Sequence, residues 1–173
     1  MNALLKLYAG LCLFRRGPED MPPIPPLLGI LLALWMVLQL LAASLQTGLT
    51  LAQMVGAQLI ALGLVLGASA AILTFKGLRQ RWLQTALALV GVDIALTLVS
   101  LPLLLLGHAA GGTPGFINGL YLLLISWQLA VQSFIFHRAF AVGPLLGLAL
   151  AFGLFILTFL LIGMAMPEAL QAG

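Results

Sequence analysis

The sequence predicts an all-α membrane protein in which five transmembrane helices follow a short interfacial N-terminal helix. Its side chains are 63% hydrophobic and only 6% charged, whereas a soluble domain carries about a quarter charged residues. Five apolar stretches reach about 20 residues, the length that a helix needs to cross about 30 Å of hydrocarbon. The seven Lys and Arg residues all lie before the first stretch or in the second and fourth gaps between stretches. Such an asymmetry is typical of a polytopic membrane protein.

Residues 1–23 are expected to form a segment on the cytoplasmic membrane surface. Apolar residues recur at helical spacing between Leu4 and Phe14, while Lys6 and Arg16 can face water, which is typical of an interfacial helix. The next stretch, up to residue 26, is rich in proline, which fixes φ and lacks an N–H donor, so this stretch is extended or turned. A Pro-rich ligand for a soluble partner is the alternative. We prefer a turn into the first span, because the stretch lies so close to the membrane.

The five spans are predicted at residues 24–45, 53–75, 82–106, 117–136 and 142–164, within one transmembrane domain of residues 24–166. The first gap is short and neutral, and the third, residues 107–115, is rich in Gly and contains Pro, which break helices. Residues 167–173 form a short outer tail. Basic residues stay on the cytoplasmic side. The N-terminus and the gaps that hold Lys76 and Arg138 are therefore expected inside, and His108 and the C-terminus outside.

Asp93 is the one ionisable residue deep inside a predicted span. An acidic side chain at the bilayer centre costs about 2.5–3.5 kcal/mol on insertion scales unless it is neutralised or paired. Thr85, Thr97 and Ser100 lie at helical spacing from Asp93, so they share one stripe with it. We expect this polar stripe to face protein rather than lipid.

The fourth predicted span carries a matching polar face that holds Asn118, Tyr121, Gln128 and Gln132. Asp93 and Gln128 lie at similar depth when residues are counted from the cytoplasmic ends at about 1.5 Å per residue. We expect the third and fourth spans to pack through these faces, with Asp93 hydrogen-bonded to Gln128 or to nearby hydroxyl groups. Asp93 is expected to be largely protonated at neutral pH, because burial favours the uncharged form of a carboxyl group.

The sequence leaves two roles open for Asp93. One role makes it a proton or cation site on a translocation path, and the other makes it a structural hydrogen-bonding node. A proton relay needs a chain of ionisable groups. His108 and His137 lie at opposite edges of the membrane and far from Asp93 in depth. The sequence therefore favours the node.

Small residues recur every fourth position on two other spans. Gly63 and Gly67 lie on the second span, and Gly143 and Gly147 on the fifth. This spacing lets helix backbones approach closely. We expect these glycines to pack helices together, and the spacing does not distinguish packing within one bundle from packing between two chains.

Several function classes lack their sequence signatures. The basic residues form no basic face, which argues against nucleic-acid binding. No Ser-His-Asp group can be assembled at one depth, and the single Cys12 and isolated histidines offer no metal or cofactor site. Arg79, Arg81 and Arg138 are candidates for binding anionic lipid headgroups on the inner face, although topology control explains them equally well. We therefore expect a protein that is not an enzyme.

Two short motifs accompany the five-span pattern: RGPEDMP at residues 16–22, just before the first span, and QTAL at residues 84–87, which opens the third. With a cytoplasmic N-terminus, this arrangement resembles the bacterial members of the Yip1-like integral membrane family. The resemblance implies a multi-pass protein of the bacterial inner membrane and supplies no catalytic residue. Eukaryotic members work with small GTPases through long cytosolic N-terminal regions. This chain lacks such a region, so that partnership is not carried over.

The sequence thus favours a non-enzymatic inner-membrane scaffold or accessory subunit. Its partners would be membrane lipids and either another membrane protein or a second copy of the chain. The alternative is a small transporter or proton-coupled channel that uses Asp93. A hydrated cavity that reaches Asp93 from one side would favour transport, whereas a dry Asp93 and an exposed Gly-lined groove would favour assembly.

Overall fold

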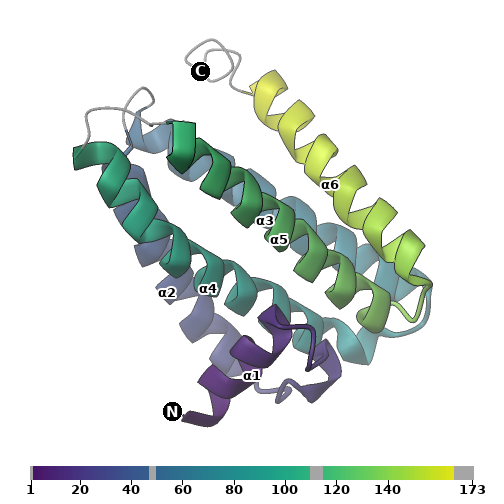
Figure 1. The fold of residues 1–173 in the computed structure, drawn as a ribbon. Helices are drawn as coiled ribbons and strands as arrows, with labels where there is room; N and C mark the ends of the chain where they lie inside the picture. Colours follow the sequence, from purple (N-terminus) through teal and green to yellow (C-terminus); the bar gives the residue numbers. More distant parts are fainter. Residues whose placement is uncertain (1, 47–49, 110–114, 166–173) are drawn as a thin grey trace.

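The structure is a computed structural model that describes residues 2–46, 50–109 and 115–165. Every element in these residues is a helix (Figure 1). The long helices α2 to α6 are each long and apolar enough to cross a membrane, and α1 and the short helix η1 precede them. The predicted fold class is therefore confirmed. The elements are α1(Asn2–Cys12), η1(Pro18–Asp20), α2(Pro25–Ser44), α3(Leu51–Phe75), η2(Arg79–Arg81), α4(Trp82–Ala109), α5(Gly115–Ala139) and α6(Pro144–Ala165).

The helix ends follow local sequence signals. Pro25 and Pro144 open α2 and α6, where a missing N–H costs nothing. Thr50 caps α3 by accepting a hydrogen bond from the Gln53 backbone at 3.3 Å. The helices α4 and α5 extend further into the Gly-rich gap than predicted, so His108 lies in the last turn of α4 instead of in a loop. Residues 47–49 and 110–114 of the two predicted outer gaps, and the predicted tail, lie outside the described residues.

The helix α4 is the centre of the bundle, because it contacts α1, α2, α3 and α5. All of its residues from 85 to 92 are buried, so this part of the helix is covered on every side. The helix α6 packs mainly against α5 and also contacts α3. Lys76, at the end of α3, donates a hydrogen bond to the Phe140 carbonyl oxygen at 2.7 Å. We call this end of the bundle, which also holds Arg79, Arg81 and Arg138, the basic end.

The helix α1 crosses α4 near the basic end (Figure 1). The Tyr8 hydroxyl donates to the Leu87 carbonyl oxygen at 3.3 Å. Gly91 makes room for the Tyr8 ring, since a Cβ atom at this position would collide with that ring. Burial raises the pKa of Tyr8 to about 12. Lys6 is exposed as expected, but Leu11 is completely buried, so the N-terminal segment is part of the core as well as an amphipathic surface helix.

The connector between α1 and α2 is tied to α4 and α5. The Gln84 amide donates to the carbonyl oxygens of Glu19 at 3.3 Å and Met21 at 3.0 Å. The Glu19 carboxylate forms an ion pair with Arg138. The two motifs at residues 16–22 and 84–87 therefore touch each other. Proline in the connector limits its conformations, which lowers the entropy lost when it docks.

Replacing Gly91 by leucine is expected to displace α1 from α4. Burial raises the pKa of the Cys12 thiol in α1, so little reactive thiolate is present at pH 7. Release of α1 would return this pKa toward its ordinary value and increase maleimide labelling of Cys12 several-fold, measured by mass spectrometry on the detergent-purified protein. Gly29→Leu is the control, because a Cβ atom there meets nothing within 4 Å. Equal labelling rates in Gly91→Leu and wild type would contradict this account of α1 docking.

Candidate functional site

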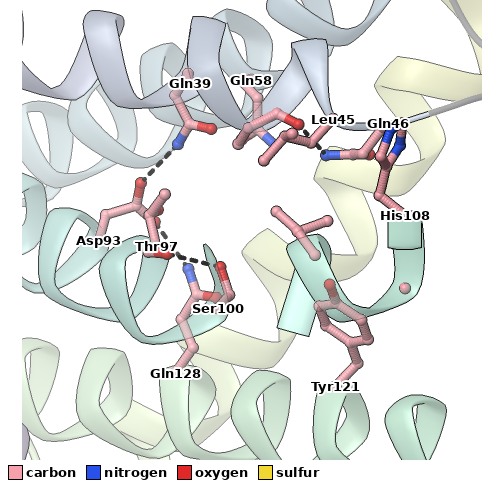
Figure 2. A pocket seen from close by; sticks show the side chains of 13 residues that line it. Gln39, Leu45, Gln46, Gln58, Asp93, Thr97, Ser100, His108, Tyr121 and Gln128 are labelled. Atoms are coloured by element: carbon pink, nitrogen blue, oxygen red, sulfur yellow. Dashed lines mark hydrogen bonds between the residues drawn. The ribbon is translucent and has the colours of Figure 1, made fainter. Parts of the chain in front are cut away.

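Asp93 joins three helices through its carboxyl group. Its Oδ2 atom accepts hydrogen bonds from Trp35 Nε1 at 2.6 Å and Gln39 Nε2 at 3.3 Å, both from α2. Its Oδ1 atom accepts from Gln128 Nε2 of α5 at 2.9 Å. Figure 2 shows Asp93 between Gln39 and Gln128. The contact between Asp93 and Gln128, predicted from their equal depth, is confirmed.

Sequence reasoning missed Trp35 and Gln39. They lie four residues apart on α2, so they share one face of that helix. Both are buried, with exposed fractions of 2% for Trp35 and 7% for Gln39. The signal that could have found them is an amide in the middle of a helix that is otherwise apolar, one turn from an indole that needs an acceptor.

The electrostatic environment of Asp93 contains opposing contributions. Burial in the bundle favours the protonated form, whereas three converging N–H donors favour the carboxylate. No Lys, Arg or His among the described residues forms an ion pair with Asp93. A carboxyl group in this setting is suited to hold a proton or to exchange that proton for another cation.

A polar cavity of about 600 Å³ leads away from Asp93. It extends to the ends of α2 and α4 that lie opposite the basic end, where Gln46 and His108 line it (Figure 2). The Tyr121 hydroxyl is buried and has no hydrogen-bond partner among the described residues, and Tyr121 lines this cavity. The hydroxyl is therefore available to a bound molecule. The other lining residues are Gln39, Ala42, Leu45, Gln58, Asp93, Thr97, Ser100, Leu104, Gly107 and Gln128.

The predicted polar stripe divides into two parts. Thr97 and Ser100 line the polar cavity with Asp93, and Gln132 lines a second cavity that also reaches Asp93. Thr85 does not join this group. It lies two turns toward the basic end, where its hydroxyl donates to the Arg81 carbonyl oxygen at 2.8 Å. The prediction that Thr85 belongs to the node was wrong. Thr85 and Asp93 share a helix face, but their spacing of eight residues separates them by about 12 Å along the helix axis.

The predicted packing glycines have different surroundings. A Cβ atom at Gly147 would lie 2.7 Å from the Ser133 carbonyl oxygen, so Gly147 lets α6 approach α5 closely. Gly143 precedes α6 and has open space around it. Gly63 and Gly67 are exposed on α3, and a Cβ atom there would meet nothing within 4 Å. Within the described chain they pack against no other helix.

The predicted lipid-binding arginines all lie at the basic end. Arg79 is exposed, whereas Arg81 and Arg138 line a small pocket together with Glu19. Because Arg138 is paired with Glu19, part of its charge is already compensated. Among the residues that the structure describes, no group of three His, Cys, Asp or Glu side chains could hold a metal ion.

No protein-family model, no curated protein and no solved structure matches the chain. The resemblance to the Yip1-like family stays a prediction.

Replacing Asp93 by asparagine is expected to leave the thermal midpoint of unfolding within a few degrees of wild type, because an amide oxygen still accepts from Trp35 and Gln39. Asp93→Leu removes the acceptor of three donors, of which those of Trp35 and Gln39 belong to buried residues, and each buried donor left unsatisfied costs about 1–3 kcal/mol. Its midpoint should fall strongly. Tryptophan fluorescence during heating in detergent measures both, with Ser126→Leu on the exposed face of α5 as the control. Equal losses in the two Asp93 variants would show that the node does not depend on accepting hydrogen bonds.

Proposed function

We propose that the protein is a small membrane carrier that exchanges a proton for a monovalent cation at Asp93. The observation that carries this proposal is the polar cavity of about 600 Å³ that reaches a half-buried carboxyl group without an ion-pair partner among the described residues. Intramembrane carboxyl groups in water-accessible cavities are typical of proton and cation pathways. The cavity is the feature that distinguishes this function from a purely structural node.

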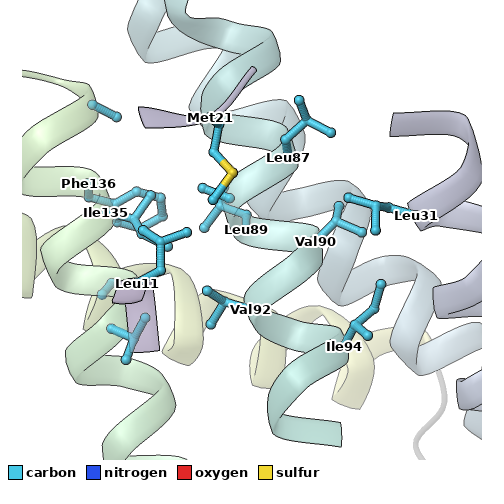
Figure 3. Close-up of a cluster of buried hydrophobic side chains, with 14 of the residues drawn as sticks. Leu11, Met21, Leu31, Leu87, Leu89, Val90, Val92, Ile94, Ile135 and Phe136 are labelled. Carbon is cyan, nitrogen blue, oxygen red and sulfur yellow. The ribbon is translucent and has the colours of Figure 1, made fainter. Parts of the chain in front are cut away.

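The two halves of the bundle differ in a way that suits a carrier. The polar cavity occupies the half that ends at His108. In the other half, Leu11, Met21, Leu87 and Phe136 pack together and are buried (Figure 3). Access to Asp93 is thus favoured from one side, and passage to the other side requires a rearrangement near the docked N-terminal segment.

The exchange follows from the chemistry of Asp93. A cation that enters the cavity pairs with the carboxylate, which Trp35, Gln39 and Gln128 stabilise through their donors. Loss of that cation leaves the carboxylate without an ion-pair partner inside the bundle, which favours uptake of a proton. Binding of the cation and protonation are therefore mutually exclusive, which couples their movements.

We propose a bacterial inner-membrane location with the basic end in the cytoplasm, since Lys and Arg are retained on that side. The polar cavity then faces the periplasm. Arg79 and Arg81 would lie near the anionic headgroups of the inner leaflet.

Reconstituted vesicles test the carrier. Vesicles that contain a pH-sensitive dye are diluted into tetramethylammonium chloride or potassium chloride, and proton efflux is followed by fluorescence. Wild type should release protons as the cation enters, and Asp93→Asn should lose at least nine-tenths of the rate. Tyr121→Phe and His108→Gln change the other titratable groups that line the cavity. Both variants should still couple cation entry to proton release, because Asp93 is intact.

Asp20→Asn is the matched control, because Asp20 accepts from the Gly17 backbone at the basic end and does not line the polar cavity. Its transport rate should equal that of wild type. If neither cation drives a proton flux that depends on Asp93, the carrier proposal is overturned.

The scaffold function is the second candidate, and an exposed face of α3 favours it. Gly63, Gly67 and Ala71 repeat every fourth position on this face and are all exposed. Such a surface suits close packing against a helix of another membrane protein or of a second copy, whereas lipid needs no such groove.

Gly67→Leu is expected to weaken any assembly through this face without unfolding the chain, since a Cβ atom there meets nothing within 4 Å. Size-exclusion chromatography with light scattering in mild detergent measures the assembled fraction, which should fall several-fold. Gly153→Leu on α6 is the control, because Gly153 is also exposed and surrounded by open space. An assembled fraction that is the same in both variants would rule out this face as the contact.

A further inference from the structure

A second cavity, of about 270 Å³, also reaches Asp93. Its walls come mainly from apolar residues of α3, α5 and α6, among them Leu62, Val65, Ile135, Phe155, Phe159 and Ile162. We call it the apolar cavity. Phe155 and Phe159 pack edge to face with their ring centroids 5.1 Å apart, which gives this wall a defined shape.

The polar and apolar cavities meet at the same residues. Asp93, Gln58 and Gln128 line both of them. Thr158 also lines the apolar cavity, but its hydroxyl donates to the Leu154 carbonyl oxygen of its own helix at 2.8 Å. The apolar cavity therefore begins at a polar junction and continues between hydrocarbon and aromatic side chains.

The charges around the junction select one kind of head group. Among the described residues, no Lys or Arg lines either cavity, and Asp93 is the acidic side chain at the junction. A phosphate or carboxylate would be repelled there, whereas a cation pairs with Asp93. The amides of Gln58 and Gln128 and the Tyr121 hydroxyl can contact a polar head from the side of the polar cavity.

We propose that the molecule bound here is an amphipath with an ammonium head and one alkyl chain, its head at Asp93 and its chain in the apolar cavity. This inference rests on the proposed cation site and adds the class of the cation. A group the size of a water molecule takes about 30 Å³, so the apolar cavity of about 270 Å³ has room for a chain of about nine carbons. A second chain of that length does not fit in this volume, so we infer a single-chain amphipath.

The binding test uses the full chain in detergent micelles, with Trp82→Phe and Trp127→Phe so that the fluorescence comes from Trp35. Trp35 both donates to Asp93 and lines the apolar cavity, so it reports on the junction itself. The probes are tetramethylammonium and a series of alkyltrimethylammonium ions, whose charge does not change with pH. Affinity should rise about fourfold for each added methylene and level off at about nine carbons.

Two variants distinguish binding in the apolar cavity from partitioning of the probes into the micelle. Ala61→Phe places a ring in the apolar cavity, and Ala149→Phe adds the same ring on the exposed face of α6. Ala61→Phe should flatten the dependence on chain length and leave tetramethylammonium binding unchanged, whereas Ala149→Phe should behave like wild type. If Ala61→Phe does not fold, Ala57→Leu fills part of the same cavity.

The outcomes distinguish the two proposals. Suppose that tetramethylammonium binding depends on Asp93, but affinity depends on chain length in the same way in Ala61→Phe and Ala149→Phe. The proposal of an amphipathic ligand is then overturned, and the proposed cation site stands. If Asp93→Asn binds tetramethylammonium as tightly as wild type, both the cation site and the amphipath are overturned.

Discussion

The structure depends on one intramembrane carboxyl group that three helices share. Asp93 of α4 accepts hydrogen bonds from α2 and α5. Polar groups without hydrogen-bond partners are costly inside a membrane-spanning bundle, so the donors and the acceptor remain together. This requirement sets the rotation of three helices about their axes and their relative depth, which apolar contacts between helices and lipid define only weakly.

The central position of α4 explains the difference between the two ends of the bundle. Near the basic end, α1 and η1 pack against α4 and bury Leu11 and Met21. Beyond Asp93, the helices enclose a polar cavity instead. The same helix thus has a closely packed half and a half that lines a polar cavity, with Asp93 at the boundary. A site at such a boundary is well placed to respond to a rearrangement on either side.

The proposed carrier and the proposed amphipathic ligand use the same geometry. The carboxyl group supplies the charge, and the polar cavity supplies access for a hydrated cation. The apolar cavity supplies surface for a hydrocarbon chain. The exposed glycines of α3 lie on a separate face, so assembly through that face is compatible with transport through the bundle.

The sequence by itself determined the fold class, the five spans and the contact between Asp93 and Gln128. These depend on length, hydropathy and depth along a helix, which are local properties. Tertiary structure decided the roles of Trp35 and Gln39, the docking of α1, the two cavities and the outward position of Gly63 and Gly67. These depend on which helices become neighbours and how each is rotated. In helices that are apolar almost all round, hydropathy carries little information about that rotation.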